Sequence, residues 1–209
     1  MRIRKILKNK RGMIGVEAAI VMIAFVIVAA AFSFMVVNMG LFATQRGRDT
    51  IQQGIHESST PLMLDGSVLI RGNGTGDGVD AVVIPLKTLG VKYVPMANET
   101  TVVTLRIETT IAYANIYNGI DAIDPTGQSY NNLIGNVTQG RAELFVENSN
   151  NDDSLNTQEK GYLVICMRSN EEAVKRDHVF IEIRPEKGAP LSVEFVVPSE
   201  LEAGWLTIG

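Results

Sequence analysis

The chain of 209 residues contains only one cysteine and two histidines. A single cysteine cannot form an intramolecular disulfide, so a domain working outside the cell would have to rely on its packed core. The histidines, His56 and His178, lie 122 residues apart without neighbours at metal-ligand spacing, which argues against a zinc site. Neither a Gly-x-Ser-x-Gly elbow nor a glycine-rich loop between a strand and a helix occurs. We therefore expect no enzyme activity and no cofactor.

Acidic residues outnumber basic ones, and the basic residues are unevenly placed. The chain has 19 Lys and Arg against 23 Asp and Glu, a net charge of −4. Six of the basic residues, and no acidic residue, fall within positions 1–12. Without that segment 13 basic residues remain against 23 acidic ones, a net charge of −10. Such an acidic surface repels nucleic acid, so we expect no nucleic-acid partner.

A long apolar run follows the basic segment. From Ala18 to Gln45 there is no charged residue in 28 positions. As a helix this run would be about 42 Å long, enough to cross the hydrocarbon core of a bilayer. Basic residues ahead of an apolar segment tend to stay on the cytoplasmic side. We therefore expect the chain to be exported or inserted in a membrane, with its C-terminal bulk outside.

Two cleavage positions are conceivable near this run. An ordinary secretory signal would be cut around Ala29–Ala31, but apolar residues continue beyond that point. A cut between Gly12 and Met13 would instead remove the basic segment and keep the apolar helix. This arrangement resembles the class III, type IV pilin-like leader, which implies a leader peptide at 1–12 and a prepilin-type signal peptidase. A plain membrane anchor that keeps its basic flank is the alternative.

Two features of the expected helix indicate contacts with other helices. Glu17 would be the fifth residue after the cut, and a carboxylate within an apolar membrane helix needs a partner. The new α-amino group of Met13, in the same chain or a neighbour, would supply one. Gly40, Gly47 and Gly54 recur every seven residues on nearly one face, although each costs up to about 1 kcal/mol of helix stability relative to alanine. We expect Glu17 and the glycines to serve assembly, with chance spacing of the glycines as the alternative.

The pattern changes from helix to strand at Pro61. The helix is expected to begin near Ile14 and to end before Pro61, a length of roughly 68 Å for about 45 residues. Beyond it, apolar and polar residues alternate, most clearly over 103–111. Eight strands separated by Gly, Pro, Asn and Asp clusters are expected at 67–70, 81–86, 92–94, 103–111, 142–147, 162–167, 179–184 and 191–197. The predicted fold is α+β, with a long hydrophobic N-terminal helix over 13–60 and an antiparallel β-sandwich or barrel over 61–209.

Three stretches carry a resemblance to a known family. They are Gly15–Ala31, Phe145–Asn150 with the following Glu159–Ile165, and Ile183–Leu191. The chain resembles the archaellins, the flagellins of archaea. The resemblance implies a filament of identical subunits with the N-terminal helix in its core and an Ig-like β-sandwich outside, on the cell surface. It also implies a membrane-inserted precursor and an archaellum motor and assembly platform as partners. The alternatives are a type IV adhesion pilin and a monomeric membrane-anchored surface-binding domain.

Polar turns carry candidate modification sites. N-x-S/T sequons begin at Asn73, Asn98 and Asn136, each in or beside a turn-like stretch where a glycan would project into solvent. Since N-glycosylation is common in the family that the chain resembles, we predict it at all three positions.

Two further features favour structural roles. The segment Asn148–Glu159 follows the spacing of an EF-hand loop, but its sixth position is Asp153 where glycine is needed, and its flanks are predicted strands. A solvated acidic loop is therefore favoured over a metal site. Cys166 lies in an apolar strand-like run, where a buried, inert thiol is expected.

Overall fold

The computed structural model describes residues 10–58, 61–108 and 111–208, with side chains described from Gly15 to Ile55 in the first segment. The chain divides into two compact units, Met1–Gly54 and Ile55–Gly209. Most of the predicted leader, residues 1–9, lies outside the described residues. Gly12 and Met13 fall within the first helix, although their side chains also lie outside the description.

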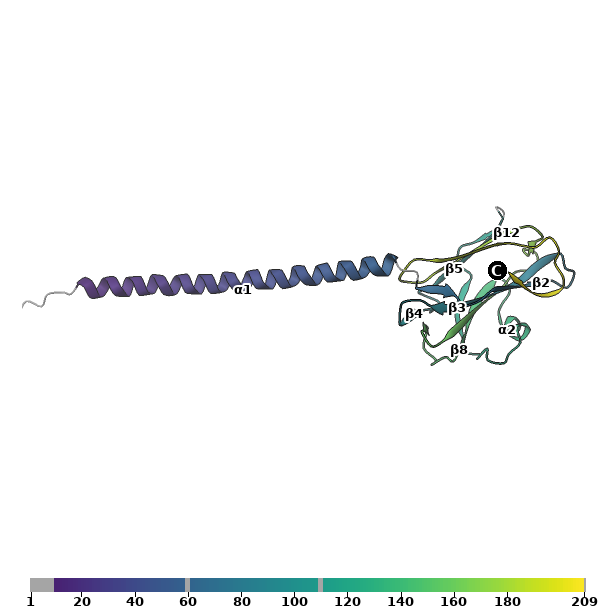
Figure 1. The fold of residues 1–209 in the computed structure, drawn as a ribbon, viewed down its shortest axis with the longest axis horizontal. Helices are drawn as coiled ribbons and strands as arrows, with labels where there is room; N and C mark the ends of the chain where they lie inside the picture. The colour runs from purple at the N-terminus through teal and green to yellow at the C-terminus, as the bar shows by residue number, and fades with distance from the viewer. Residues whose placement is uncertain (1–9, 59–60, 109–110, 209) are drawn as a thin grey trace, which may run out of the picture. The chain divides into compact units, whose positions relative to one another are not determined.

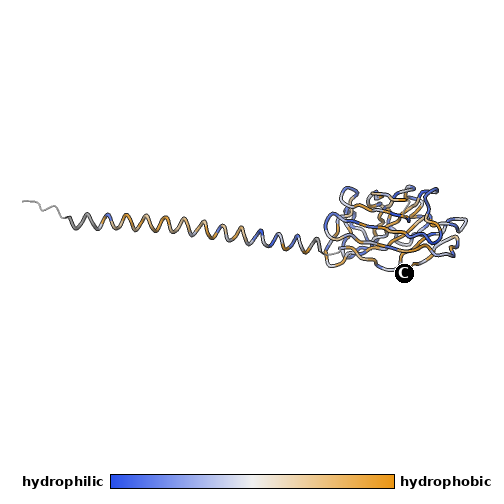
Figure 2. Tube along the Cα trace, turned by 90° about the horizontal axis from the view of Figure 1, so that it is seen from above, coloured by the Kyte–Doolittle hydropathy of each residue, from blue (hydrophilic) through white to orange (hydrophobic). Residues whose placement is uncertain are grey.

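The described part of the first unit is one helix, α1 (Lys10–Ser58), of 49 residues, whose last four residues belong to the second unit (Figure 1). It forms without interruption because it contains no proline, and it ends just before Pro61 as predicted. Its start is four residues earlier than the expected Ile14. The apolar colour of Figure 2 dominates most of the helix and gives way to a mixed pattern toward its C-terminal end.

The second unit contains two main β-sheets and a small ribbon. The larger sheet has eight strands, with the order β14-β2-β3-β10-β8-β7 and with β1 and β11 also pairing β3. Its strands are β1 (Leu62–Leu64), β2 (Val68–Gly72), β3 (Gly78–Thr88), β7 (Tyr117–Asp121), β8 (Arg141–Glu147), β10 (Lys160–Cys166), β11 (Ala173–Val174) and β14 (Gly204–Ile208). All its pairs are antiparallel except β7 with β8, which run parallel.

The smaller sheet has the order β13-β12-β5-β6 and is antiparallel throughout. Its strands are β5 (Val102–Ile107), β6 (Ile111–Tyr113), β12 (His178–Arg184) and β13 (Leu191–Val196). A separate two-stranded ribbon pairs β4 (Tyr93–Pro95) with β9 (Ser154–Asn156). The strands of the β-unit are seen together in Figure 1.

The two sheets bury one shared core. Alternate residues of the larger sheet, such as Ile84 and Leu163, belong to the same buried cluster as Ile181 of the smaller sheet. On its other face the larger sheet is covered by the short helix α2 (Tyr130–Asn136), which packs Leu133 and Ile134 into a second buried cluster. Two facing sheets around one core make the domain a β-sandwich rather than a closed barrel. The predicted α+β fold, with a long apolar helix followed by a β-sandwich, is confirmed.

One predicted strand is wrong in its extent. The run 103–111 was expected to form a single strand, but β5 ends at Ile107 and β6 begins at Ile111. Glu108 adopts a left-handed backbone with φ of 48°, which stops the strand. The chain then turns back, so that Ile107 and Ile111 become antiparallel partners. Residues 109 and 110 lie outside the described residues.

Candidate assembly surface and modification sites

The helix α1 exposes its apolar side chains. Met22, Phe25 and Phe34 each leave 71% of their surface accessible. The segment Gly15–Ile55 is long and apolar enough to cross a membrane, and its most apolar stretch contains no buried residue. Signal sequences near an N-terminus are also helices of this length and apolar composition. An apolar surface of this extent needs lipid or other protein to cover it.

Glu17 is the one charged residue from Gly15 to Gln45 of this helix. Its side chain is exposed, and it takes part in none of the ion pairs formed by the described residues. Met13 precedes it by four positions within α1, so that the two residues lie one helical turn apart on one face. An amino terminus created at Met13 would therefore lie near the carboxylate, in the position that the sequence predicts for a partner.

The three glycines have open space beside them within the single chain. A Cβ atom added to Gly40, Gly47 or Gly54 would meet no atom within 4 Å apart from the adjoining residues and backbone of the helix itself. The hydroxyl of Thr44 donates to the Gly40 carbonyl at 2.8 Å, so the helix backbone there also accepts a side-chain bond. No contact among the described residues of this unit demands glycine at these positions. If glycine is required, the requirement comes from another molecule.

The sequons differ in accessibility. Asn98 and Asn136 are exposed, whereas Asn73 is half-buried. The Asn73 side-chain amide donates to Glu172 at 2.7 Å, and its oxygen accepts from the Thr75 hydroxyl at 2.9 Å. The Asn136 amide donates to the carbonyl of Asn132 within α2 at 2.8 Å.

Asn98 lies in a turn closed by the bond from the Thr100 amide to the Ala97 carbonyl, at 3.1 Å. No side-chain hydrogen bond holds Asn98 among the described residues. A glycan on Asn98 therefore requires the least rearrangement, whereas one on Asn73 would replace a hydrogen on the nitrogen that donates to Glu172.

The loop between β8 and β10 is closed by its own hydrogen bonds. Glu159 is only 3% exposed, and its two carboxylate oxygens accept the backbone N–H groups of Asn150 at 3.0 Å and Asn156 at 2.7 Å. Asp152 accepts the side-chain amide of Asn150 at 2.7 Å, which holds the pKa of Asp152 below its usual range. Both flanks are strands, as predicted. Within the described residues, no cluster of three His, Cys, Asp or Glu side chains is arranged to hold a metal.

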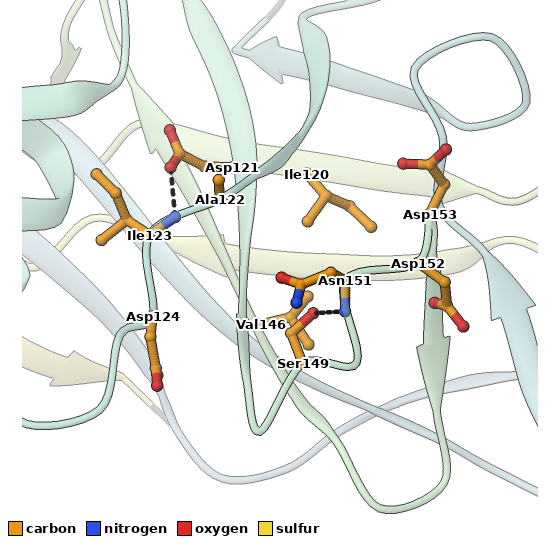
Figure 3. A pocket seen from close by; sticks show the side chains of 10 residues that line it. All are labelled: Ile120, Asp121, Ala122, Ile123, Asp124, Val146, Ser149, Asn151, Asp152 and Asp153. Atoms are coloured by element: carbon orange, nitrogen blue, oxygen red, sulfur yellow. Dashed lines mark hydrogen bonds between the residues drawn. The ribbon is translucent and has the colours of Figure 1, made fainter.

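An acidic hollow lies beside this loop (Figure 3). It has a volume of about 390 Å³. Asp121 and Asp124 reach it from the segment that ends and follows β7, and Asp152 and Asp153 from the loop that precedes β9. Hydrogen bonds from Thr126 hold the pKa of Asp124 below its usual range, so this carboxylate stays ionised. We call this cavity, with its four carboxylates, the acidic hollow. The sequence alone did not indicate it.

The remaining candidate residues have structural surroundings. Cys166 is buried at the end of β10, and burial raises the pKa of its thiol, as expected for an inert cysteine. His178 contacts Glu194 on the adjacent strand β13, with Nε2 2.6 Å from Oε1. The side chain of His56 lies outside the described residues.

The chain combines an exposed apolar helix at the N-terminus with a self-contained β-sandwich, an architecture typical of membrane-anchored and filament-forming subunits. The model of archaeal-type flagellin matches residues 12–195. Probable flagellin 1 of Aeropyrum pernix is 38% identical over 202 residues, which cover 95% of this chain and 97% of that relative. Probable flagellin 1 of Archaeoglobus fulgidus is 28% identical over 95% of this chain and 96% of that relative.

Solved structures show the same fold. The archaeal flagellum of Methanospirillum hungatei strain JF1 matches with a TM-score of 0.60 and 21% identity, over 92% of this chain and 98% of that chain. The crystal structure of archaeal flagellin FlaB1 from Methanocaldococcus jannaschii matches with a TM-score of 0.55 and 15% identity, over 70% and 94%. The chain belongs to the archaeal-type flagellin family. It is a structural subunit of the archaellum filament, which lies on the outside of the cell.

Proposed function

We propose that this subunit polymerises through α1, which forms the core of the filament while the β-domain faces solvent. The observation that carries this proposal is the exposed apolar surface of Gly15–Ile55, whose most apolar stretch contains no buried residue. At about 25 cal/mol per Å², burying roughly 1,500 Å² of apolar surface would contribute on the order of 40 kcal/mol before entropy costs. Helix packing of this kind replaces the lipid that surrounds the precursor in the membrane.

The precursor is processed before assembly in this proposal. A prepilin-type signal peptidase removes residues 1–12 by cutting between Gly12 and Met13, which leaves a core helix over 13–60 and an outer domain over 61–209. The match of the family model from residue 12 onward supports the position of this boundary. The amino group freed at Met13 then pairs with Glu17 in the same or a neighbouring subunit, which sets the register between subunits.

Close helix packing along the glycine stripe is part of the same proposal. Gly40, Gly47 and Gly54 allow the backbones of neighbouring helices to approach, because no side chain intervenes. Within the single chain nothing stands beside these glycines, so a neighbouring helix can reach the backbone there. The outer domain carries N-glycans at Asn73, Asn98 and Asn136, of which Asn98 is the most accessible in the structure.

The assembled filament serves swimming motility, turned by the archaellum motor after export through its assembly platform. It has no catalytic activity, and its partners are other copies of itself and these membrane components. Deleting the gene should remove the surface filaments seen by electron microscopy and abolish swimming, and the full chain should restore both. Restored filaments without restored swimming would point to an adhesion pilin, and a surface protein that never forms filaments would point to an anchored monomer.

A further inference from the structure

A second surface of the subunit combines exposed apolar and basic side chains. A groove of about 380 Å³ lies beside β4 and includes Val91, Lys92, Tyr93 and Lys187. Tyr93 exposes 58% of its surface, and the adjacent Leu89 exposes 52%. Large apolar side chains gathered at one place on a solvent-facing domain mark an interaction surface. We call Lys92, Tyr93 and Lys187 the basic patch.

The charges of the basic patch are unpaired within the subunit. Lys92 and Lys187 are exposed and occur in none of the ion pairs that the described residues form. The surrounding domain is acidic, with 11 basic against 20 acidic residues over 61–209. Two unpaired lysines beside an exposed tyrosine therefore fit an acidic partner surface.

The acidic hollow offers the complementary surface on the same domain. Its four carboxylates also occur in no ion pair among the described residues. Beside them lies the half-buried side chain of Ile120, which an incoming aromatic ring can contact (Figure 3). The lowered pKa of Asp124 keeps its charge available to a lysine.

The two surfaces adjoin at the small ribbon, where Lys92, Tyr93 and Asp152 line one further hollow. The basic patch is on and beside β4, and the acidic hollow includes the loop leading into β9, its antiparallel partner. The amide of Met96 donates to the carbonyl of Asp153 at 2.8 Å, which ties the end of β4 to that loop. The ribbon thus joins part of each surface, whereas Lys187 follows β12 and Asp121 and Asp124 lie at and beyond the end of β7.

We propose that the basic patch of one subunit binds the acidic hollow of a neighbouring copy. Lys92 and Lys187 then face the carboxylates of Asp121 and Asp124, and the ring of Tyr93 enters the hollow. A contact between two different surfaces is head-to-tail, the kind that extends along a helical polymer. The inference rests on the proposed assembly of identical subunits and adds a β-domain contact to the one made by α1.

The apolar helix of a neighbour is the less suitable occupant of the groove. Residues 18–45 of α1 carry no charge, so they would desolvate the lysines without pairing them. The acidic hollow supplies both counter-charges and an apolar contact. A second copy of the β-domain therefore offers counter-charges to both lysines of the basic patch.

Zero-length cross-linking of assembled filaments tests this contact directly. Filaments of mixed ¹⁵N-labelled and unlabelled subunits are treated with a water-soluble carbodiimide, which joins a lysine to a carboxylate only at contact distance. Mass spectrometry should find mixed-label pairs joining Lys92 or Lys187 to the acidic hollow. Lys175, whose Nζ lies 3.8 Å from Asp77 Oδ1, provides the control pair within one chain. Detection of the control pair without the mixed-label pairs would overturn the inference.

Charge reversal provides a second test that does not depend on cross-linking. The variant K92E/K187E should raise the concentration needed for polymerisation on the order of tenfold, which corresponds to about 1.4 kcal/mol. Adding D121K/D124K to the same chain should return that concentration to the value of the unaltered chain. The control variant K175E/R176E, whose change in charge equals that of K92E/K187E, should leave the concentration unaltered. Failure of the fourfold variant to recover, or an equal effect of the control, would contradict the contact. Wild-type protein that forms no filaments would instead refute the proposed function.

Discussion

The hydroxyl of Tyr117 donates a hydrogen bond to the carbonyl of Met96 at 2.6 Å, joining two segments that are 21 positions apart. Tyr117 begins β7 and is 2% exposed, while Met96 directly follows β4 and is fully buried. Burial raises the pKa of Tyr117 well above its usual range, with a smaller contribution from the negative charge of Asp153. The bond therefore fixes the β4–β9 ribbon to the larger sheet.

Removing this hydroxyl should destabilise the β-domain. In Tyr117→Phe the buried carbonyl of Met96 loses its donor, so the free energy of unfolding should fall by about 1–3 kcal/mol. Tyr93→Phe is the matched control, since Tyr93 is exposed and should change the stability by less than about 0.5 kcal/mol. Urea unfolding followed by circular dichroism measures both, and equal effects would show that the bond contributes nothing.

The carboxylate of Glu159 should be equally necessary for the loop between β8 and β10. In Glu159→Gln one of the two backbone N–H groups would face an amide NH₂ in a buried place, at a cost of about 1–3 kcal/mol. Glu200→Gln, at an exposed position, is the control. A thermal melt that is unchanged in Glu159→Gln would mean that the loop is held by other groups.

Several parts of this fold follow from local sequence patterns, whereas others depend on distant contacts. The helix α1 and strands such as β10 and β12 are marked by apolar runs or strict alternation, so they were predictable. The helix α2 was not, because its seven residues include three asparagines, and Leu133 and Ile134 gain their stability by packing on a distant sheet. Strand β14 was missed because its residues are only partly buried and show weak alternation.

The candidate sites divide in the same way. Sequence reasoning singled out Glu17, the glycine stripe and the sequons, since each is a local pattern. The acidic hollow depends on the parallel pairing of β7 with β8, which brings residues 121–124 beside residues 149–153. By spacing alone, Glu159 occupies the last position of an EF-hand-like loop. In the fold its carboxylate oxygens instead accept backbone N–H groups.

The glycine stripe should tolerate alanine better than leucine. Gly47→Leu should block or distort polymerisation through overpacking between helices, while leaving the β-domain folded, because Gly47 belongs to the other unit. Gly47→Ala adds a single carbon and raises helix propensity, so its assembly should resemble that of the unaltered chain more closely than the assembly of Gly47→Leu does. Electron microscopy of sheared filaments compares the two variants, and normal filaments of Gly47→Leu would place the stripe away from any helix contact.

The β-domain alone should fold but not polymerise. A chain starting at Pro61 retains both buried clusters, so it should be soluble and β-rich by circular dichroism. It lacks the apolar surface of α1 and should sediment as a monomer or small oligomer. Filaments of native diameter from this domain would show that α1 is not the assembly element.

The N-terminus of the subunit in sheared filaments tests the central claim most directly, because the account requires the basic leader to be removed and the apolar helix to be kept. Mass spectrometry of the extracellular protein should give a mature chain that begins Met13-Ile14-Gly15. A chain that begins within Ala29–Phe32 would mean that an ordinary signal peptide had been removed with most of the apolar run, and it would contradict assembly through α1.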